Sequence, residues 1–278
     1  MTYGKRNILI VVGLVFTVLV IAGFPLATLF SGRSGWVDHP LSRLPSHSWW
    51  LSYGISPPTR GQYIWYAAAL LALVLLVFAA CLILRSIYRR TASEEVFFFL
   101  LFLFTYPFEL LRSWNAVLSL NGSSVFVTVV CARIIYFGRF FGWTSLFISS
   151  LYAIRIRYRN LGILLLVALL LSLTLASALP LDSSDMLADY LYRLGDEAAV
   201  LFVLLICQLF STINYFVAAF RRQNRRFTVA ALAVLLTILG KVTIVFLGSP
   251  AQSMIGLFLS AAGISLFIRQ MNQIHLWI

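Results

Sequence analysis

The sequence predicts an all-α fold: one transmembrane helical bundle of about eight spans, with both termini in the cytoplasm. Of the 278 residues, 61% are hydrophobic and only 11% are charged, whereas soluble domains carry about 25% charged residues. The apolar residues form runs near the length of about 20 that a helix needs to cross ~30 Å of hydrocarbon. The 21 Lys and Arg residues gather in short clusters between these runs.

Eight apolar runs qualify as spans, because a helix satisfies its own backbone hydrogen bonds in hydrocarbon. We expect them near residues 7–30, 62–84, 95–111, 134–154, 161–179, 198–220, 227–248 and 253–268. Together they make a single integral membrane domain over residues 1–278, with no soluble domain. A count of seven or nine is the alternative, because polar residues interrupt residues 112–134. That segment either extends a neighbouring helix or lies in the membrane interface.

The first run has the charge pattern of an export signal, since Lys5 and Arg6 precede it. It is about twice as long as the core of a cleaved signal peptide, and no clear small-x-small cleavage site follows. We therefore expect a retained signal anchor.

The distribution of basic residues predicts the orientation. With an even number of spans, thirteen Lys and Arg fall on the side of the termini and five on the opposite side. Loops rich in Lys and Arg stay in the cytoplasm, so both termini are expected there, in a multi-pass protein of the cytoplasmic (plasma) membrane, the inner membrane of the cell. The thirteen are Lys5, Arg6, Arg85, Arg89, Arg90, Arg155, Arg157, Arg159, Arg221, Arg222, Arg225, Arg226 and Arg269, and the five are Arg33, Arg43, Arg60, Arg112 and Arg193.

Two connections on the outer side have some length. Residues 31–61 are rich in aromatic side chains, as expected where a chain meets lipid headgroups, and their prolines disfavour a long helix. Residues 183–194 are expected to form a short amphipathic helix, with Asp189 and Arg193 at i and i+4, stopped by Gly195. Neither connection is large enough for a folded receptor domain.

Four charged residues fall inside the expected spans, at a cost of roughly 2.5 to 3.5 kcal/mol each on insertion scales. They are Glu109, Arg133, Arg139 and Lys241, and all four are expected in the outer half of the bilayer. If they converge, they form a cationic pocket for an anionic ligand such as a carboxylate, a phosphate or a lipid headgroup. Arginine suits this role because its planar fork binds oxyanions through two parallel hydrogen bonds.

Structural explanations for these charges stand beside the functional one. Arg133 and Lys241 are near enough to the surface for their long stems to reach the headgroups. One structural alternative for Glu109 is an ion pair with Arg112, three residues later in the same helix. For Arg139, the alternative is pairing with Glu109 or with a backbone carbonyl. Arg133 and Arg139 are six residues apart, about 600° of helical rotation, so they point to different faces.

The sixth span carries a polar face made of Gln208, Ser211 and Thr212 at i, i+3 and i+4. Such residues either tie neighbouring helices together or line a polar path. A stripe of small residues in the last span favours close helix packing, at Gly256, Ser260 and Gly263.

Other functional classes lack support in the sequence. The basic clusters between apolar runs fit anionic lipid headgroups, so no nucleic-acid partner is expected. The histidines are isolated and match no metal-ligand spacing. No catalytic arrangement or phosphate loop is present, so we expect no cofactor and no enzyme activity.

The layout, several helices with short loops, is similar to that of the membrane sensor modules that precede signalling enzymes. We therefore expect a sensor-like or accessory protein that binds an anionic small molecule or lipid in its outer half. It would act through a partner, a separate signalling or transport subunit. The alternative is a small transporter or permease subunit, a class that often shows internal duplication and helices broken near the membrane midplane.

Overall fold

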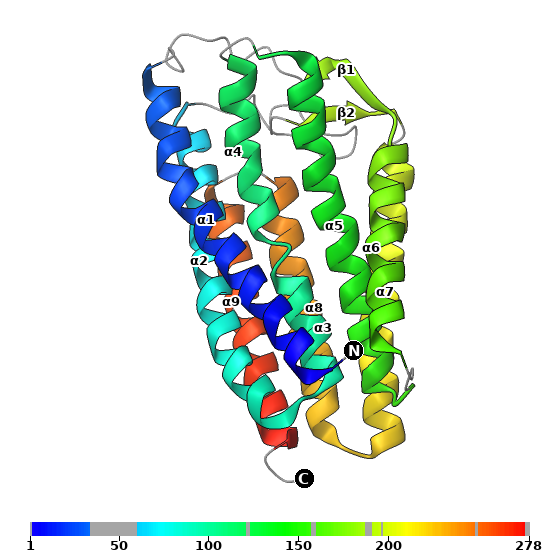
Figure 1. Cartoon of the computed structure of the whole chain (residues 1–278). Helices are drawn as coiled ribbons and strands as arrows, with labels where there is room; N and C mark the ends of the chain where they lie inside the picture. Colours follow the sequence, from blue (N-terminus) through cyan, green and yellow to red (C-terminus); the bar gives the residue numbers. More distant parts are fainter. Residues whose placement is uncertain are drawn as a thin grey trace.

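A computed structural model describes residues 2–33, 60–120, 123–156, 160–186, 191–195, 197–247 and 250–275. Over these residues the chain forms an elongated bundle of helices with one small β-hairpin at one end (Figure 1). The elements are α1 (Tyr3–Arg33), α2 (Arg60–Thr91), α3 (Glu94–Leu103), α4 (Pro107–Leu120), α5 (Val125–Ala153), α6 (Leu161–Ala178), β1 (Leu181–Met186), β2 (Tyr192–Leu194), α7 (Glu197–Arg222), α8 (Arg225–Leu247) and α9 (Pro250–His275).

Eight helical segments of the described chain are long and apolar enough to cross a membrane, which confirms the predicted number of apolar helices. The third segment combines α3 and α4, and the fourth is α5, which begins nine residues earlier than expected, at Val125. Helix α4 continues to Leu120, so the uncertain region between residues 112 and 134 extends the two neighbouring helices. Hydropathy missed these helical turns because it falls wherever polar residues occur, including those that are buried.

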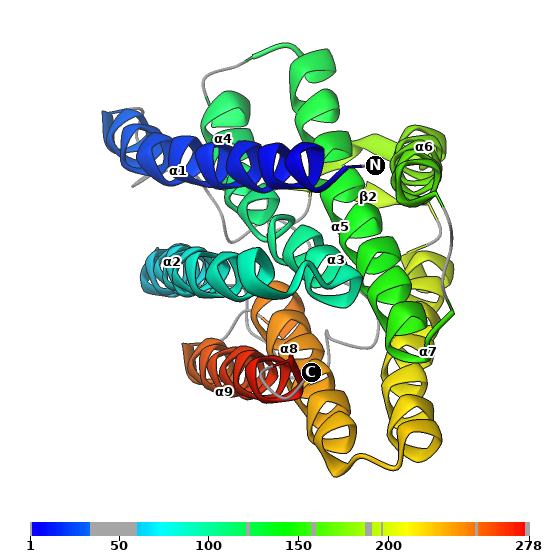
Figure 2. The same ribbon diagram turned by 60° about the horizontal axis from the view of Figure 1, so that its bottom comes forward.

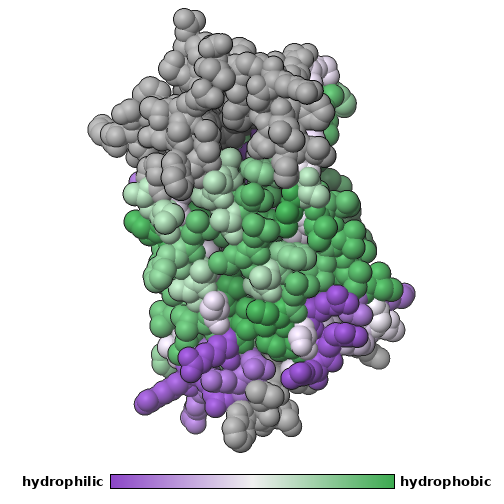
Figure 3. Space-filling view, turned by 90° about the vertical axis from the view of Figure 1, so that its left-hand side faces the viewer, coloured by the Kyte–Doolittle hydropathy of each residue, from purple (hydrophilic) through white to green (hydrophobic). Residues whose placement is uncertain are grey.

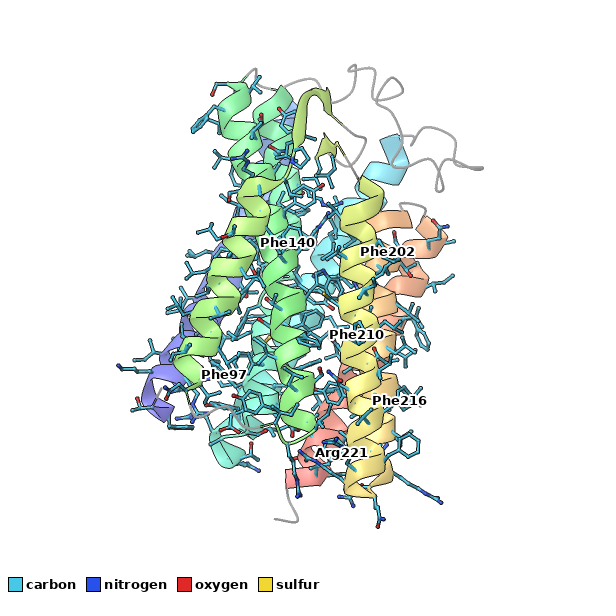
Figure 4. All side chains as sticks on the ribbon, turned by 90° about the vertical axis from the view of Figure 1, so that its right-hand side faces the viewer. Phe97, Phe140, Phe202, Phe210, Phe216 and Arg221 are labelled. Atoms are coloured by element: carbon cyan, nitrogen blue, oxygen red, sulfur yellow. The ribbon has the colours of Figure 1, made fainter. Side chains whose placement is uncertain are left out.

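The outside of the bundle carries a broad apolar belt with hydrophilic residues below it (Figure 3). On the opposite face, shown in Figure 4, large apolar side chains also point outward, for example Phe202 and Phe210 of α7, which are 64% and 54% exposed. Helix α6 has a mean hydropathy of 2.5 and is buried over only 22% of its span. Because few soluble proteins expose such a continuous apolar surface, this belt is suited to contact with lipid.

Arginines gather at one end of the bundle, in the last turns of α2 and α7 and at the start of α8. We name it the arginine-rich end, and the opposite end, which holds β1 and β2, the hairpin end. The first turn of α1 lies at the arginine-rich end, where Tyr3 stacks on Tyr88 of α2 at 5.8 Å between ring centroids. The last turns of α9 lie there too, because Arg226 donates a hydrogen bond of 2.7 Å to the carbonyl of Gln273.

Helices α8 and α9 pack closely through small residues. A Cβ atom at Gly263 would lie 2.6 Å from the carbonyl oxygen of Ala233 and 2.6 Å from the amide nitrogen of Thr237. At Gly256 it would lie 2.9 Å from the carbonyl oxygen of Gly240. The small side chains of the last span therefore bring two helical backbones into contact.

The expectation of a helix over residues 183–194 is wrong. Strand β1 pairs with β2 in antiparallel fashion, with Leu181 opposite Leu194 and Asp182 opposite Arg193. Gly195 does not stop a helix, and its amide donates a 2.9 Å hydrogen bond to the carbonyl of Pro180 beside the hairpin.

Tertiary burial explains this difference. Leu191 is fully buried, Tyr192 is 5% exposed, and the Tyr192 hydroxyl lies 2.6 Å from that of Thr128 on α5. An exposed Asp–Arg pair at i and i+4 stabilises a helix by only about 0.2 to 0.5 kcal/mol, whereas burying one leucine side chain contributes about 1.5 to 3 kcal/mol. Asp189 lies outside the described residues, as does nearly all of the aromatic-rich connection.

Candidate functional site

The third apolar segment is broken near its middle. Helix α3 ends at Leu103 and α4 begins at Pro107, which has no backbone N–H to continue the helical ladder. Between the two helices the chain forms a tight turn, in which hydrogen bonds span three residues instead of four. The amide of Thr105 donates to the carbonyl of Phe102, and the amide of Tyr106 donates to the carbonyl of Leu103, each at 3.1 Å. The segment lies inside the bundle, 83% buried, and bends at this point (Figure 2).

Two glycines let α5 approach the bend. A Cβ atom at Gly142 would lie 2.5 Å from Oγ1 of Thr105, and one at Gly138 would lie 2.6 Å from the ring of Phe108. Because these glycines precede and follow Arg139, the absence of their side chains brings the Arg139 backbone close to the first turn of α4.

Glu109, in that first turn, binds two arginines. The Nε of Arg139 donates to Oε1 of Glu109 at 3.0 Å, and its Nη2 donates to Oε2 at 3.2 Å. The Nη2 of Arg112 lies 3.0 Å from the same Oε2, and its Nη1 donates to the carbonyl of Val245 at 3.4 Å. One carboxylate thus joins α4 to α5, and Arg112 extends the cluster to α8.

Lys241 of α8 completes the group of buried charges. Its ammonium nitrogen lies 4.5 Å from the ring centroid of Tyr106, 5.4 Å from that of Trp143 and 5.6 Å from that of Phe102. These distances permit cation–π attraction, which contributes about 2 kcal/mol when the cation is desolvated. Among the described residues the ammonium has no hydrogen-bond acceptor.

The cluster is cationic and shielded from solvent. Glu109 and Arg112 are each 2% exposed, Lys241 is 3% exposed and Arg139 is 5% exposed. Among the described residues, the three cations and one anion of the cluster have a formal charge of +2. In an environment of low dielectric constant such an excess is costly unless a negative group shares it.

The structure separates the four charges singled out in the sequence. Glu109, Arg139 and Lys241 lie within this cluster, whereas Arg133 is exposed on the outside of α5. The position of Arg133 agrees with the six-residue spacing, which places it on a different face of the helix from Arg139.

The polar face of α7 forms bonds within its own helix. Gln208, Ser211 and Thr212 are all buried. The hydroxyl of Ser211 donates to the carbonyl of Cys207 at 2.8 Å, and that of Thr212 donates to the carbonyl of Gln208 at 3.1 Å. These bonds satisfy both hydroxyls.

Sequence reasoning missed the aromatic cage and the full role of Arg112. Phe102, Tyr106 and Trp143 look like ordinary apolar packing residues, and no spacing signal links α3 and α5 to Lys241. The alternative that Glu109 pairs with Arg112 at i and i+3 is confirmed, but the contact of Arg112 with Val245 of α8 was not expected, because Arg112 was placed in an outer connection.

A second buried ion pair, at the arginine-rich end, was also missed. Arg222 donates a 2.9 Å hydrogen bond to Oε1 of Glu95, and its guanidinium lies 4.3 Å from the ring centroid of Phe227. The hydroxyl of Ser149 donates to the Glu95 carbonyl at 2.8 Å and lies 2.8 Å from that of Tyr215. This network connects α3, α5 and α7, which suits a structural role.

Within the described residues, no group of three or more His, Cys, Asp or Glu side chains is placed to hold a metal ion. The chain matches no protein-family model, no curated protein and no solved structure.

We predict that Glu109→Gln strongly destabilises the protein, because it leaves two buried arginines without their carboxylate. Breaking a buried pair costs about 3 to 5 kcal/mol, measurable as a lower midpoint of unfolding in detergent. The matched control is Glu94→Gln, since Glu94 is 41% exposed and its nearest contact with Arg6 is 4.0 Å; its loss should cost about 1 kcal/mol or less. Similar midpoints for the two variants would contradict a central role for Glu109.

Proposed function

We propose that the chain is a multi-pass protein of the cytoplasmic membrane, with both termini in the cytoplasm. Eight sufficiently long apolar helices and the apolar belt support membrane residence. The arginine-rich end supports the orientation, because clusters of Lys and Arg remain on the cytoplasmic side. Helices α1 and α9 both have their terminal turns at that end.

The orientation is testable with reporters. Alkaline phosphatase, active only outside the cytoplasm, should be inactive when fused after His275, whereas green fluorescent protein at the same point should fluoresce. A phosphatase inserted after Pro180, at the hairpin end, should be active. An active phosphatase at the C-terminus, or a purified chain that stays dissolved without detergent, would contradict this part of the proposal.

We further propose that the buried cluster binds an anionic group, a carboxylate or a phosphate, in the outer half of the membrane. The observation that carries this proposal is Lys241, a buried ammonium with three aromatic neighbours and no hydrogen-bond acceptor in the described chain. An anion at its nitrogen would supply the acceptor and reduce the charge excess of +2. Lys241 is six residues before the end of α8, about 9 Å along the helix axis.

The other members of the cluster have distinct roles in this proposal. Arg139 donates two hydrogen bonds to Glu109, so its guanidinium positions the Glu109 carboxylate. Those two donors are therefore not available to the ligand. Lys241 supplies the direct contact, and the rings of Tyr106 and Trp143 exclude water from it. Binding would change the packing of α8 against the bend, and a separate subunit would sense that change.

The binding proposal predicts that an anion stabilises the protein through Lys241. A ligand present at a hundred times its Kd raises the unfolding free energy by about 2.7 kcal/mol. We expect acetate, citrate, inorganic phosphate or glycerol phosphate, compared with chloride at equal ionic strength, to raise the unfolding midpoint of the wild type. The increase should disappear in Lys241→Gln.

The matched control is Lys5→Gln, which removes the same charge from an exposed position on α1. This variant should keep the full response to the anion. If no anion shifts the wild type, or if Lys241→Gln and Lys5→Gln respond equally, the cluster is not the binding site.

The alternative, a small transporter or permease subunit, is favoured by one observation. The bend at Thr105–Pro107 interrupts an apolar segment beside buried charges, and transporters place substrate sites at helices broken near the midplane. A bend of this kind allows α3 and α4 to move separately, which alternating access requires.

Uptake into proteoliposomes distinguishes the two functions. If the chain transports the anion that stabilises it, Pro107→Ala should reduce the uptake rate several-fold, because it restores a continuous helix. The control Pro180→Ala, which lies outside the helices, should leave the uptake rate unchanged. Binding without uptake by the wild type would exclude transport by the chain alone and favour the sensor-like function.

A further inference from the structure

A basic groove lies on the outer face of α2 at the arginine-rich end, away from the buried cluster. It has a volume of about 470 Å³ and is lined by Leu82, Arg85, Ser86, Arg89 and Arg90. Four of these positions, 82, 85, 86 and 89, follow the spacing i, i+3, i+4 and i+7, so they share one helix face. All of the lining residues that the structure describes therefore belong to α2, and four of them share one face.

The groove arginines differ in pairing from two other arginines of the same end. Arg222 binds Glu95 and Arg226 binds a backbone carbonyl of α9. Arg85, Arg89 and Arg90 form no ion pair with any acid of the described chain. Three positive charges thus line the groove with no acidic residue among them.

An apolar surface continues from the groove into the belt. Leu82 is 46% exposed, and Leu75, seven residues earlier on the same face, is 47% exposed. A ligand that fills the groove and extends along α2 would therefore meet cations at one end and leucine side chains at the other. This order of contacts fits an amphipathic anion, with a charged head and an acyl chain.

We propose that this groove binds the phosphate of an anionic phospholipid, in the leaflet that faces the arginine-rich end. The guanidinium groups of Arg85 and Arg89 donate to the phosphate oxygens, the hydroxyl of Ser86 adds a neutral donor, and the acyl chain lies along Leu82 and Leu75. A zwitterionic headgroup fits less well, because its own cation would meet three arginines. The inference uses the proposed membrane residence but is independent of anion binding at Lys241.

Lipid titration tests the groove in the delipidated full-length chain, held in neutral detergent. Phosphatidylglycerol and phosphatidylethanolamine with identical acyl chains are added, and bound lipid is counted by native mass spectrometry. We expect a preference for phosphatidylglycerol that falls at least five-fold in Arg85→Gln/Arg89→Gln. The matched control is Arg221→Gln/Arg225→Gln, which removes two exposed arginines from the same end outside the groove, and it should change the affinity less than two-fold.

A second variant guards against misfolding. Ser86→Glu places a carboxylate among the arginines at an exposed position and should abolish the preference while the unfolding midpoint stays near that of the wild type. If both double variants lose the preference for phosphatidylglycerol equally, the lipid responds only to the net charge of this end, and the proposal is overturned. Competition by millimolar inorganic phosphate, as effective as the lipid itself, would assign the groove to a soluble phosphate and also overturn it. The topology reporters test membrane residence separately.

Discussion

The centre of this bundle depends on the carboxylate of Glu109. It binds Arg139 on α5 and Arg112 on its own helix, and Arg112 reaches the backbone of α8 at Val245. The break before Pro107 places Glu109 in the first turn of α4, where the positive end of the helix dipole favours a carboxylate. The attraction within a buried ion pair offsets the cost of desolvation only when the partners are well oriented. The close approach of α5 at Gly138 and Gly142 provides that orientation.

Within the described residues, the single carboxylate of Glu109 does not neutralise the three cations around it. Two arginines share Glu109, and Lys241 has aromatic faces as neighbours. The quadrupole of an aromatic ring attracts an ammonium group, but the ring has no oxygen lone pair to accept a hydrogen bond from it. Because a well-packed apolar side chain is often as stable as a buried ion, packing alone gives little reason to place a lysine there. This is the physical basis for the proposal that Lys241 binds an anion.

The eight apolar helices could be predicted from the sequence because each depends on local hydropathy, a property of consecutive residues. The hairpin that includes Tyr192 could not, since its strands are stabilised by contact with α5, and a local charge pattern there favoured a helix. Similarly, the cost of an intramembrane charge identified Glu109, Arg139 and Lys241 one by one. Their convergence depends on how α4, α5 and α8 rotate against one another, and the cage around Lys241 uses aromatic residues that are abundant throughout the chain.

The basic residues of the arginine-rich end show that charge alone does not define a role. Orientation requires only that cations gather on one side, and Arg222, paired with Glu95, satisfies that requirement while also tying helices together. Arg85 satisfies it as well, yet it forms no ion pair in the described chain and lines a groove. The proposed orientation would use Arg222 and Arg85 alike, so the difference in their ion pairing needs a separate explanation. The proposed phosphate in the groove provides one, since its oxygens would pair with the guanidinium of Arg85.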